Sequence, residues 1–504
     1  MNGANDDITT ERELLLLALG PATARTAARI RGLAGSAPNW DELLWDTHWH
    51  RTTAPLGRAL RASAPDLMPA RVADLLRRHA RATATYALHQ IQLLRKASQC
   101  LDALGIPSAA GRGPLLAQAY YGDAAARDPV KPPDLWILPG DRDQATDALL
   151  TAGLELHPGD GPARFEQRVH PDGGRHRFEL RLRTQESRSS GARVDAAMLE
   201  RSRSAVPPIR ILDRADMLFL LAAPLAARPW RRAQALADFT AVLRGATAAD
   251  VEAAVQRAGA GPLGMAMQLA RALTADLPAS RPAPPPEIDP ALFDLSRRLL
   301  RGRARPTAAD LERYRRLVSP TPATPPAAAV DRAGDLGEFS PNDVAIIDAM
   351  LDLAGARSSD VLYDLGCGDG RVMIRAAQRH GLRAIGIEWD PDRVEEARCR
   401  VRDAGVAGLV EVRQGDVHTC DVSDATVVYT YLRGVQTALL PRLRGELRPG
   451  TRLVSRDFDY GEWPPVRTEV LPLEPCGPPV WLFRWSIGSP ASGRRTGSNT
   501  ALGS

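Results

Sequence analysis

Residues 361–377, VLYDLGCGDGRVMIRAA, constrain the fold of this 504-residue chain more than any other stretch. A short apolar run ends at Asp364, glycines stand at positions 366, 368 and 370, and Arg371 opens a segment with helical spacing. Small residues let a loop backbone approach a ligand closely and adopt conformations that are closed to bulkier residues. The stretch therefore predicts a strand, a tight ligand-binding turn and a helix, with the ligand at the carboxyl end of the strand.

The residues after this turn predict an α/β domain. Short β-branched runs alternate with helical pieces, which is the pattern of a parallel, doubly wound sheet of the Rossmann-like kind. The predicted strands are VLYDLG, RAIGIEW, VEVRQGD, ATVVYTYL and TRLVSRDF, in that order along the chain. Helical segments separate the first three, and ALLPRLRGEL lies between the last two.

Two more acids stand where later strands of this sheet end. Glu388 comes 24 residues after Asp364, and an acid there can accept from both hydroxyls of a ribose. Asp416 ends VEVRQGD, where it can accept from an adenine amino group. Two cofactors compete for such a site. A dinucleotide fingerprint needs Gly or Ala where this chain has Arg371, whereas S-adenosylmethionine has no phosphate and fits the tighter turn, so we predict S-adenosylmethionine.

Composition bears on the compartment and the partners. The five cysteines are scattered and form no CxxC pair, which predicts reduced thiols in a cytoplasm and neither a disulfide framework nor a zinc site. No run of about 18 apolar residues occurs and the start is acidic, so we expect no signal peptide and no membrane partner. The net charge of +5 is almost all arginine, since Lys96 and Lys131 are the only lysines. Because alanine, glycine and proline are also abundant, this excess is typical of a GC-rich genome, and we predict no nucleic-acid partner.

Proline-rich stretches divide the chain. RPAPPPEIDP and SPTPATPPAAAVDRAGDLG predict semi-rigid linkers. Before them, helical patterns dominate, and segments such as DLWILP and HRFELRLR add a small sheet, so the first domain is predicted to be α+β and mostly helical. The predicted organisation is a first domain over 10–280, a proline-rich linker with short helices over 281–336, a second domain over 337–487 and a disordered tail over 488–504.

Six pieces of the second domain carry a resemblance. They are EFSPNDVAIIDAMLDLAG, DVLYDLGCGDGRVMIRAA, AIGIEWDPDRVEEAR, SDATVVYTYL, LPRLRGELRPGTRLVSRDFDYGEWPP and VWLFRW. With them, residues 337–485 resemble the class I methyltransferases, and are most similar to the small protein-lysine methyltransferases of archaea and their bacterial and mitochondrial relatives. The resemblance implies a methyltransferase that uses S-adenosylmethionine. By this resemblance the cofactor-binding residues are Phe339, Pro341, Asp364, Gly366, Gly368, Glu388 and Asp416.

Methyl transfer from a sulfonium is an in-line displacement, so the protein has to align the nucleophile and remove its water. The residues expected to face the methyl group follow the fourth and fifth predicted strands. They are Tyr429, Tyr431, Arg433, Arg456 and Asp457. Sheet packing is the alternative for the two tyrosines, and a salt bridge to Asp457 or Asp459 is the alternative for Arg456.

Arg456 decides the predicted substrate, because the family usually carries a histidine there. An arginine repels a lysine ammonium but can hold a carboxylate through two hydrogen bonds. The sequence therefore favours carboxyl O-methylation of a peptide or protein over lysine N-methylation, which stays the alternative.

The first domain has a looser resemblance, carried by NWDELLWDTHWHRTTAPLGRAL, by residues 105–156 from GIPSAAGRGP to TAGLEL, and by RFELRLR. With these pieces it resembles nucleotidyltransferase-like proteins of bacterial natural-product clusters. Such enzymes need a D-x-D pair to hold two metal ions. Here only Asp134 survives in Pro132-Pro133-Asp134, with Glu179 as a possible third acid, and Arg112 replaces the family's lysine.

These departures predict no metal site and a domain that recognises a substrate. The combined hypothesis is a tailoring enzyme that methylates a carboxyl group, for example the C-terminus, of a ribosomally made peptide. Two other classes stay open: a nucleotidyltransferase with an accessory methyltransferase fold, and a cofactor-binding regulator without catalysis.

Overall fold

The computed structural model divides the chain into two compact units, one within residues 1–328 and the other within residues 329–471 and 480–504. All structural statements below concern the described residues. These are 8–20, 22–129, 133–157, 164–169, 176–183, 194–227, 233–259, 262–276, 288–301, 309–310, 313–314, 317, 342–432, 435–461, 463–471 and 479–488.

The first unit is mostly helical, as the sequence predicted. Side chains of Thr9, Thr23 and Asn39 cap three of its helices by accepting a backbone N–H of the first turn. The helices are α1 (Thr10–Leu19), α2 (Ala24–Gly35), α3 (Trp40–His50), α4 (Thr53–Ser63), α5 (Ala70–Ala103), α6 (Pro114–Tyr121), α7 (Arg142–Thr151), α8 (Ala196–Arg201), α9 (Arg214–Ala227), α10 (Ala233–Leu243), α11 (Ala248–Ala258), α12 (Pro262–Asp276) and α13 (Pro290–Arg301).

A small seven-stranded sheet is set among these helices, in the order β3-β4-β5-β2-β1-β7-β6. The predicted strand HRFELRLR is β5, and DLWILP contains β2. The strands are β1 (Ala109–Ala110), β2 (Asp134–Trp136), β3 (Glu155–His157), β4 (Arg164–Val169), β5 (His176–Arg183), β6 (Arg203–Val206) and β7 (Ile209–Ile211).

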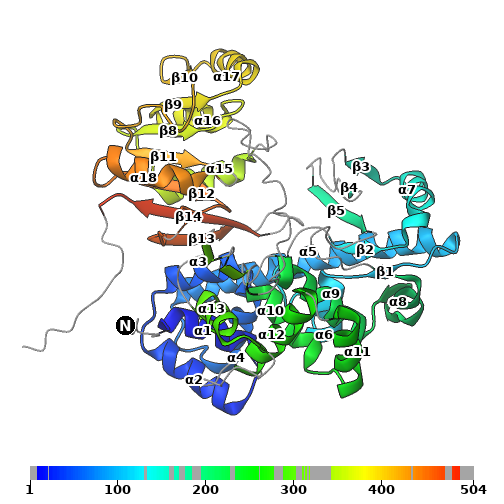
Figure 1. Ribbon diagram of the computed structural model, residues 1–504. Coiled ribbons are helices and arrows are strands. Elements are labelled where there is room, and N and C mark those ends of the chain that lie inside the picture. The colour runs from blue at the N-terminus through cyan, green and yellow to red at the C-terminus, as the bar shows by residue number, and fades with distance from the viewer. Residues whose placement is uncertain are drawn as a thin grey trace, which may run out of the picture. The chain divides into compact units, whose positions relative to one another are not determined.

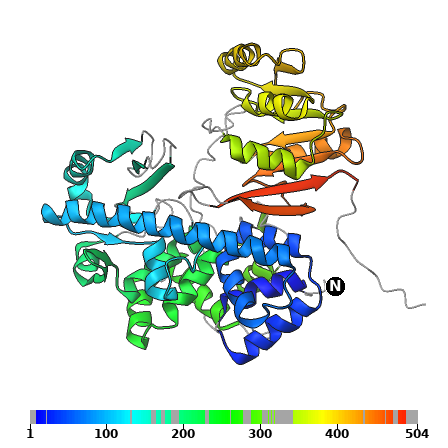
Figure 2. The same ribbon diagram turned by 180° about the vertical axis from the view of Figure 1, so that it is seen from behind.

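Helix α5 connects the two parts of this unit. Its 34 residues span roughly 51 Å at 1.5 Å per residue, from the group α1–α4 to the sheet (Figure 2). Leu93 and Leu94 of α5 pack on Leu135 and Leu180 of the sheet. Trp136, the neighbour of Leu135 in β2, belongs to the larger core on the other face, since side chains alternate along a strand.

Helix α13 lies inside the predicted linker, yet it is part of a core. Leu292 and Phe293 are buried in the same cluster as Trp136. The remainder of the predicted linker, like the predicted tail, lies largely outside the described residues.

The second unit is the α/β domain that the sequence predicted. Its sheet has the order β10-β9-β8-β11-β12-β14-β13, which can be followed from top to bottom in Figure 1. The elements are α15 (Val344–Ala354), β8 (Val361–Leu365), α16 (Arg371–His380), β9 (Arg383–Glu388), α17 (Pro391–Asp403), β10 (Val410–Gln414), β11 (Val427–Thr430), α18 (Gln436–Glu446), β12 (Arg452–Arg456), β13 (Arg467–Leu471) and β14 (Val480–Ser486).

The five predicted strands, β8 to β12, run parallel to one another. The chain runs outward from β8 to β10 and then returns to place β11 on the other side of β8. This reversal is a topological switch point, and ligands of such sheets bind at the carboxyl ends of the strands beside it. The antiparallel pair β13–β14 was not predicted, and it pairs with the edge that β12 would otherwise leave open.

Among the described residues, no helix combines the length and the apolar character needed to cross a membrane.

Candidate functional site

The glycine turn follows β8 as predicted, and its backbone requires glycine. Gly366, Gly368 and Gly370 have φ angles of 82°, 52° and 78°, the left-handed region that other residues avoid. A Cβ on Gly366 would stand 2.7 Å from Leu432 Cδ2. The turn is fixed to the next strand, because the N–H groups of Gly366 and Cys367 both donate to the carbonyl oxygen of Ile387.

Asp364 is buried at the carboxyl end of β8, with 3% of its surface exposed. Burial, followed by the nearby negative charges of Glu388 and Asp369, raises its pKa to about 8. Within the described part of the chain, no hydrogen bond to its carboxylate occurs. A buried acid of this kind fits a ligand that brings a positive charge.

Glu388 lies at the end of β9 and faces the glycine turn. Its Oε2 accepts from the Gly368 N–H at 2.8 Å, and its Oε1 accepts from the N–H groups of Trp389 and Asp390 at 3.0 and 3.1 Å. Backbone donors therefore fix the carboxylate. Each oxygen has further lone pairs, so the group can also accept from a diol.

Asp416 is close to Glu388, because the adjacent Gly415 N–H donates to the Glu388 carbonyl oxygen. One oxygen of Asp416 accepts from both the backbone N–H and the Nδ1 of His418, each at 2.8 Å. These hydrogen bonds, the backbone one first, lower the pKa of Asp416. The carboxylate is thus kept ionised and can act as an acceptor.

The predicted catalytic residues lie at the ends of β11 and β12. Tyr429 is buried and stands next to Asp364 in the strand register. The Arg456 guanidinium lies over the Tyr431 ring, 4.7 Å from its centroid, and donates to Asp457 Oδ2 at 3.2 Å. Arg456 thus makes the salt bridge to Asp457 that the sequence left as an alternative.

Some predicted site residues cannot be placed. Phe339, Pro341 and Arg433 lie outside the described residues. Their assignment to the cofactor or to catalysis stays a prediction, as does the assignment of the other site residues.

Two residues that the sequence reasoning missed belong to this region. Trp389, directly after Glu388, is 54% exposed, which is high for so large an apolar side chain. Asn342 is buried and its side chain contacts both Tyr429 and Arg456. Trp389 had a signal, since an aromatic residue next to a ribose-binding acid can stack on the base. Asn342 had none, because its partners are distant in the sequence.

The chemistry of these groups fits S-adenosylmethionine. Asp364 suits a cation, Glu388 suits a ribose diol, Asp416 suits an amino group and Trp389 offers a flat aromatic face. The Gly368 N–H of the turn already donates to Glu388 and is therefore not available to a pyrophosphate.

In the first unit, the structure places Asp134, the acid that the sequence analysis singled out, at the start of β2. Three guanidinium groups surround this buried carboxylate. Their nitrogens lie 2.8 Å (Arg181), 3.4 Å (Arg112) and 3.5 Å (Arg183) from its oxygens. Pro132, at the first position of the D-x-D pair, lies outside the described residues. The side chain of Glu179 lies outside the described part, so its prediction as a third acid is not tested.

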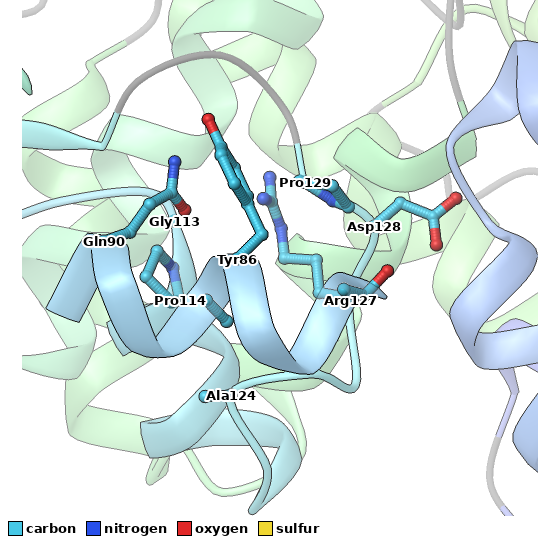
Figure 3. Close-up of a pocket in the computed structure, with 10 residues that line it drawn as sticks. Tyr86, Gln90, Gly113, Pro114, Ala124, Arg127, Asp128 and Pro129 are labelled. Carbon is cyan, nitrogen blue, oxygen red and sulfur yellow. The ribbon is translucent and has the colours of Figure 1, made fainter. Parts of the chain in front are cut away.

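Arg127 and Asp128 line a hollow in the first unit (Figure 3), and both charges are already paired there. Arg127 forms a two-pronged pair with Asp238, with nitrogen–oxygen distances down to 2.7 Å. Asp128 accepts from the N–H groups of Thr53 and Ala54 at the start of α4. We assign no ligand to this hollow.

Comparisons with known proteins confirm both resemblances. Residues 364–467 match the family described as the ANTKMT methyltransferase domain, and residues 36–278 match the family described as an uncharacterised nucleotidyltransferase. A protein-lysine N-methyltransferase of Saccharolobus islandicus is 38% identical over 152 residues, which are 30% of this chain and 93% of the relative.

Two further similarities cover the same region. The adenine nucleotide translocase lysine N-methyltransferase of Mus musculus is 34% identical over 122 residues, and the match covers 24% of this chain and 52% of the relative. The crystal structure of an RNA methyltransferase from Salinibacter ruber in complex with S-adenosyl-L-homocysteine is 50% identical. It covers 29% of this chain and 94% of its own, with a TM-score of 0.28.

Proposed function

We propose that this chain methylates lysine side chains of a protein. Through its second unit it belongs to the family of the protein-lysine N-methyltransferases. The chain is a methyltransferase that depends on S-adenosylmethionine, as the sequence predicted. The observation that carries the proposal is the 38% identity to the archaeal protein-lysine N-methyltransferase over 93% of its length.

S-adenosylmethionine supplies, when bound, a methyl group on a sulfonium sulfur. In this proposal Asp364 pairs with the cofactor's ammonium group, Glu388 accepts from its ribose, and Asp416 accepts from its adenine. Trp389 covers the adenine face. Gly366 and Gly368 keep the turn in its tight form, because both have positive φ angles and a Cβ on Gly366 would stand 2.7 Å from Leu432 Cδ2.

A lysine reaches the site as an ammonium ion and has to lose a proton before its nitrogen can attack. An apolar, aromatic surface favours that loss, because removal from water disfavours the charged form of an amine. The rings of Tyr431 and Phe458, with centroids 5.4 Å apart, offer such a surface. Asp457 holds Arg456 and accepts from the Trp481 N–H at 3.0 Å, so we assign it to positioning rather than to proton removal.

The contacts of Arg456 bear on the choice of substrate. The sequence favoured a carboxylate because an arginine would repel an ammonium. Here the charge of Arg456 is compensated by Asp457, by the Asn342 Oδ1 at 2.6 Å and by the Tyr431 ring. The repulsion is therefore reduced, and the argument against lysine loses its force.

Carboxyl O-methylation is the second candidate, favoured by the presence of Arg456 where the family usually carries a histidine. Its refinement to a ribosomally made peptide of a natural-product cluster finds no support in the comparisons and stays a prediction. In either case we assign recognition of the substrate to the first unit, because the surroundings of Asp134 are unsuited to nucleotidyl transfer.

The test is methyl transfer from isotope-labelled S-adenosylmethionine to proteins extracted from the organism that carries the gene, with the modified residue located by fragment mass spectrometry. One portion of the extract is acetylated on its lysines beforehand, and another is amidated on its carboxyl groups. Lysine methylation predicts a base-stable label that acetylation abolishes and amidation spares.

The opposite pattern, a label that mild base removes and amidation abolishes, would replace lysine by carboxyl methylation. A protein with Glu388→Ala serves as the control, because it lacks the proposed ribose acceptor and should label nothing. Binding of S-adenosylmethionine without transfer to any extract would favour the regulator without catalysis.

A further inference from the structure

Asn342 ties together three parts of the second unit that are distant in sequence. Its Nδ2 lies 3.0 Å from the hydroxyl oxygen of Tyr429, 87 residues away. Its Oδ1 accepts from Arg456 Nη1 at 2.6 Å, 114 residues away. Its carbonyl oxygen accepts from Arg371 Nη1 at 3.1 Å, at the start of α16. All polar groups of this side chain are thereby used in a buried position.

These contacts fix the direction of the hydrogen bonds. A guanidinium can only donate, so Asn342 has to turn its oxygen to Arg456 and its NH₂ group to Tyr429. The Tyr429 oxygen therefore accepts from Asn342, and its own hydrogen has to point to a different acceptor. Asn342 thus leaves the Tyr429 hydroxyl hydrogen free to be donated to a different group.

Tyr429 is a donor beside the buried acid of the site. It pairs with Asp364 across β8 and β11, and laterally paired residues of a parallel sheet point to the same face. Burial first, and then the negative charge of Asp364, raises the pKa of Tyr429 well above its usual value. The hydroxyl therefore keeps its hydrogen near neutral pH.

The cofactor offers one strong acceptor for this donor. Asp364, Glu388 and Asp416 are acids and suit the groups of S-adenosylmethionine that donate. Its only anionic group is the α-carboxylate, one carbon atom away from the ammonium group that Asp364 suits. A hydroxyl next to Asp364 can therefore donate a hydrogen bond to an oxygen of this carboxylate.

We propose that Tyr429 donates a hydrogen bond to the α-carboxylate of the cofactor and that Asn342 is the positioning residue that orients its hydroxyl for this. The proposal rests on the proposed use of S-adenosylmethionine but does not depend on which substrate is methylated. It gives the site selectivity for the amino-acid end of the cofactor. Arg456 acts in it through Asn342.

The test compares binding of S-adenosylmethionine and of decarboxylated S-adenosylmethionine, which lacks only the α-carboxylate, by calorimetry on the full-length protein. Tyr429→Phe removes the donor. Asn342→Asp keeps the shape and the contact to Arg456, but an ionised carboxylate only accepts, so the Tyr429 hydroxyl has to turn towards it.

Both variants should bind S-adenosylmethionine about tenfold or more weakly, and both should bind the decarboxylated analogue as the unchanged protein does. In the Tyr429→Phe background, Asn342→Asp should add less than its own single effect. A purely structural role of Asn342 predicts the opposite, an equal loss for both ligands.

Two controls separate the failures. Asp343→Asn changes a charge at the neighbouring exposed position and should leave both affinities unchanged. Arg456→Gln keeps a donor for Asn342 without the charge, and a loss confined to S-adenosylmethionine in this variant would assign the carboxylate to Arg456 and overturn the proposal.

If the unchanged protein binds neither ligand, the cofactor assignment itself fails. If it binds S-adenosylmethionine and both site variants bind it equally well, only the role of Asn342 and Tyr429 fails.

Discussion

Burial favours the protonated, neutral form of Asp364, whereas its proposed contact with the cofactor's ammonium group requires the ionised form. Its pKa is raised to about 8, so near neutral pH the carboxyl holds its proton in the ligand-free protein. A positively charged ligand needs the ionised form. Binding is therefore expected to release a proton, and the dissociation constant for S-adenosylmethionine should rise by roughly tenfold for each pH unit below about 8.

Calorimetry between pH 6 and pH 9, in buffers of different ionisation enthalpy, measures both the affinity and the proton release. Asp416→Asn is the matched control, since the pKa of Asp416 is lowered and its loss should weaken binding without changing the pH slope. An affinity that stays constant over this range would contradict the role of Asp364.

The same pKa predicts a stability change. An acid with a higher pKa in the folded than in the unfolded state keeps its proton longer when folded, so stability falls as pH rises from about 4 to about 8. Asp364→Asn should therefore raise the melting temperature of the ligand-free protein at pH 8.5, with a difference that shrinks towards pH 5. Scanning calorimetry of both proteins checks this, and the variant should no longer bind S-adenosylmethionine.

Trp389 is expected to stack on the adenine. Stacking of a base on an aromatic side chain contributes about 1–3 kcal/mol, so Trp389→Ala should weaken binding by roughly tenfold. Trp389→Phe should keep most of the affinity, because a phenyl ring can still stack on the base. Equal binding by all three proteins would remove Trp389 from the site.

At the residue scale, the acids could be predicted because each ends a strand at a position that the sequence pattern marks. Asn342 could not, since its role comes from contacts with Tyr429 and Arg456 that no local pattern contains. The salt bridge of Arg456 to Asp457 was an alternative in the sequence analysis, whereas its contact with Asn342 was not foreseen because it is set by tertiary structure.

At the scale of the element, the glycine turn allows a matched comparison. Gly366 and Gly381 both have positive φ angles, so alanine is strained at either position. Only at Gly366 does the added Cβ meet a neighbour, Leu432, whereas nothing lies within 4 Å of it at Gly381.

Gly381→Ala should lose about 1–2 kcal/mol of folding free energy through backbone strain, and Gly366→Ala should lose more because its Cβ also meets Leu432. Gly366→Ala should also lose cofactor binding, and Gly381→Ala should retain it. Urea unfolding and calorimetry on each variant measure the two effects. Retained binding in Gly366→Ala would show that the turn does not approach the ligand.

The elements themselves were largely predictable in the second unit. The parallel strands are short apolar runs at regular spacing, and that pattern determines both their type and their order. The pair β13–β14 escaped prediction, because an antiparallel addition depends on which edge of the finished sheet is open. Helix α13 was placed in a linker because of the prolines around it, although Leu292 and Phe293 are buried in the core of the first unit.

At the scale of the whole molecule, the proposed methyl transfer belongs to the second unit. In the first unit, guanidinium groups of Arg112, Arg181 and Arg183 lie within 3.5 Å of the Asp134 carboxylate, where they compete with a metal ion. We therefore expect no transfer of a nucleotide from labelled ATP to the protein or to added proteins, with either magnesium or manganese. Metal-dependent labelling that vanishes in Asp134→Ala would contradict this and restore the nucleotidyltransferase hypothesis.

The division into two units and the fold class of each followed from composition and periodicity, and the fold class is confirmed. The cytoplasmic location, the lack of a nucleic-acid partner and the domain boundaries stay predictions. Location and nucleic-acid binding depend on other molecules, and the domain boundaries depend on segments outside the described residues. The residue pattern of a single sequence determines neither.

The three arginines around Asp134 have a consequence for the creation of a metal site there. A new acid placed beside Asp134 would meet guanidinium groups before it met a metal ion, and would form ion pairs with them. A metal site at this place would therefore require replacement of these arginines as well as the gain of an acid, so a single substitution cannot create one.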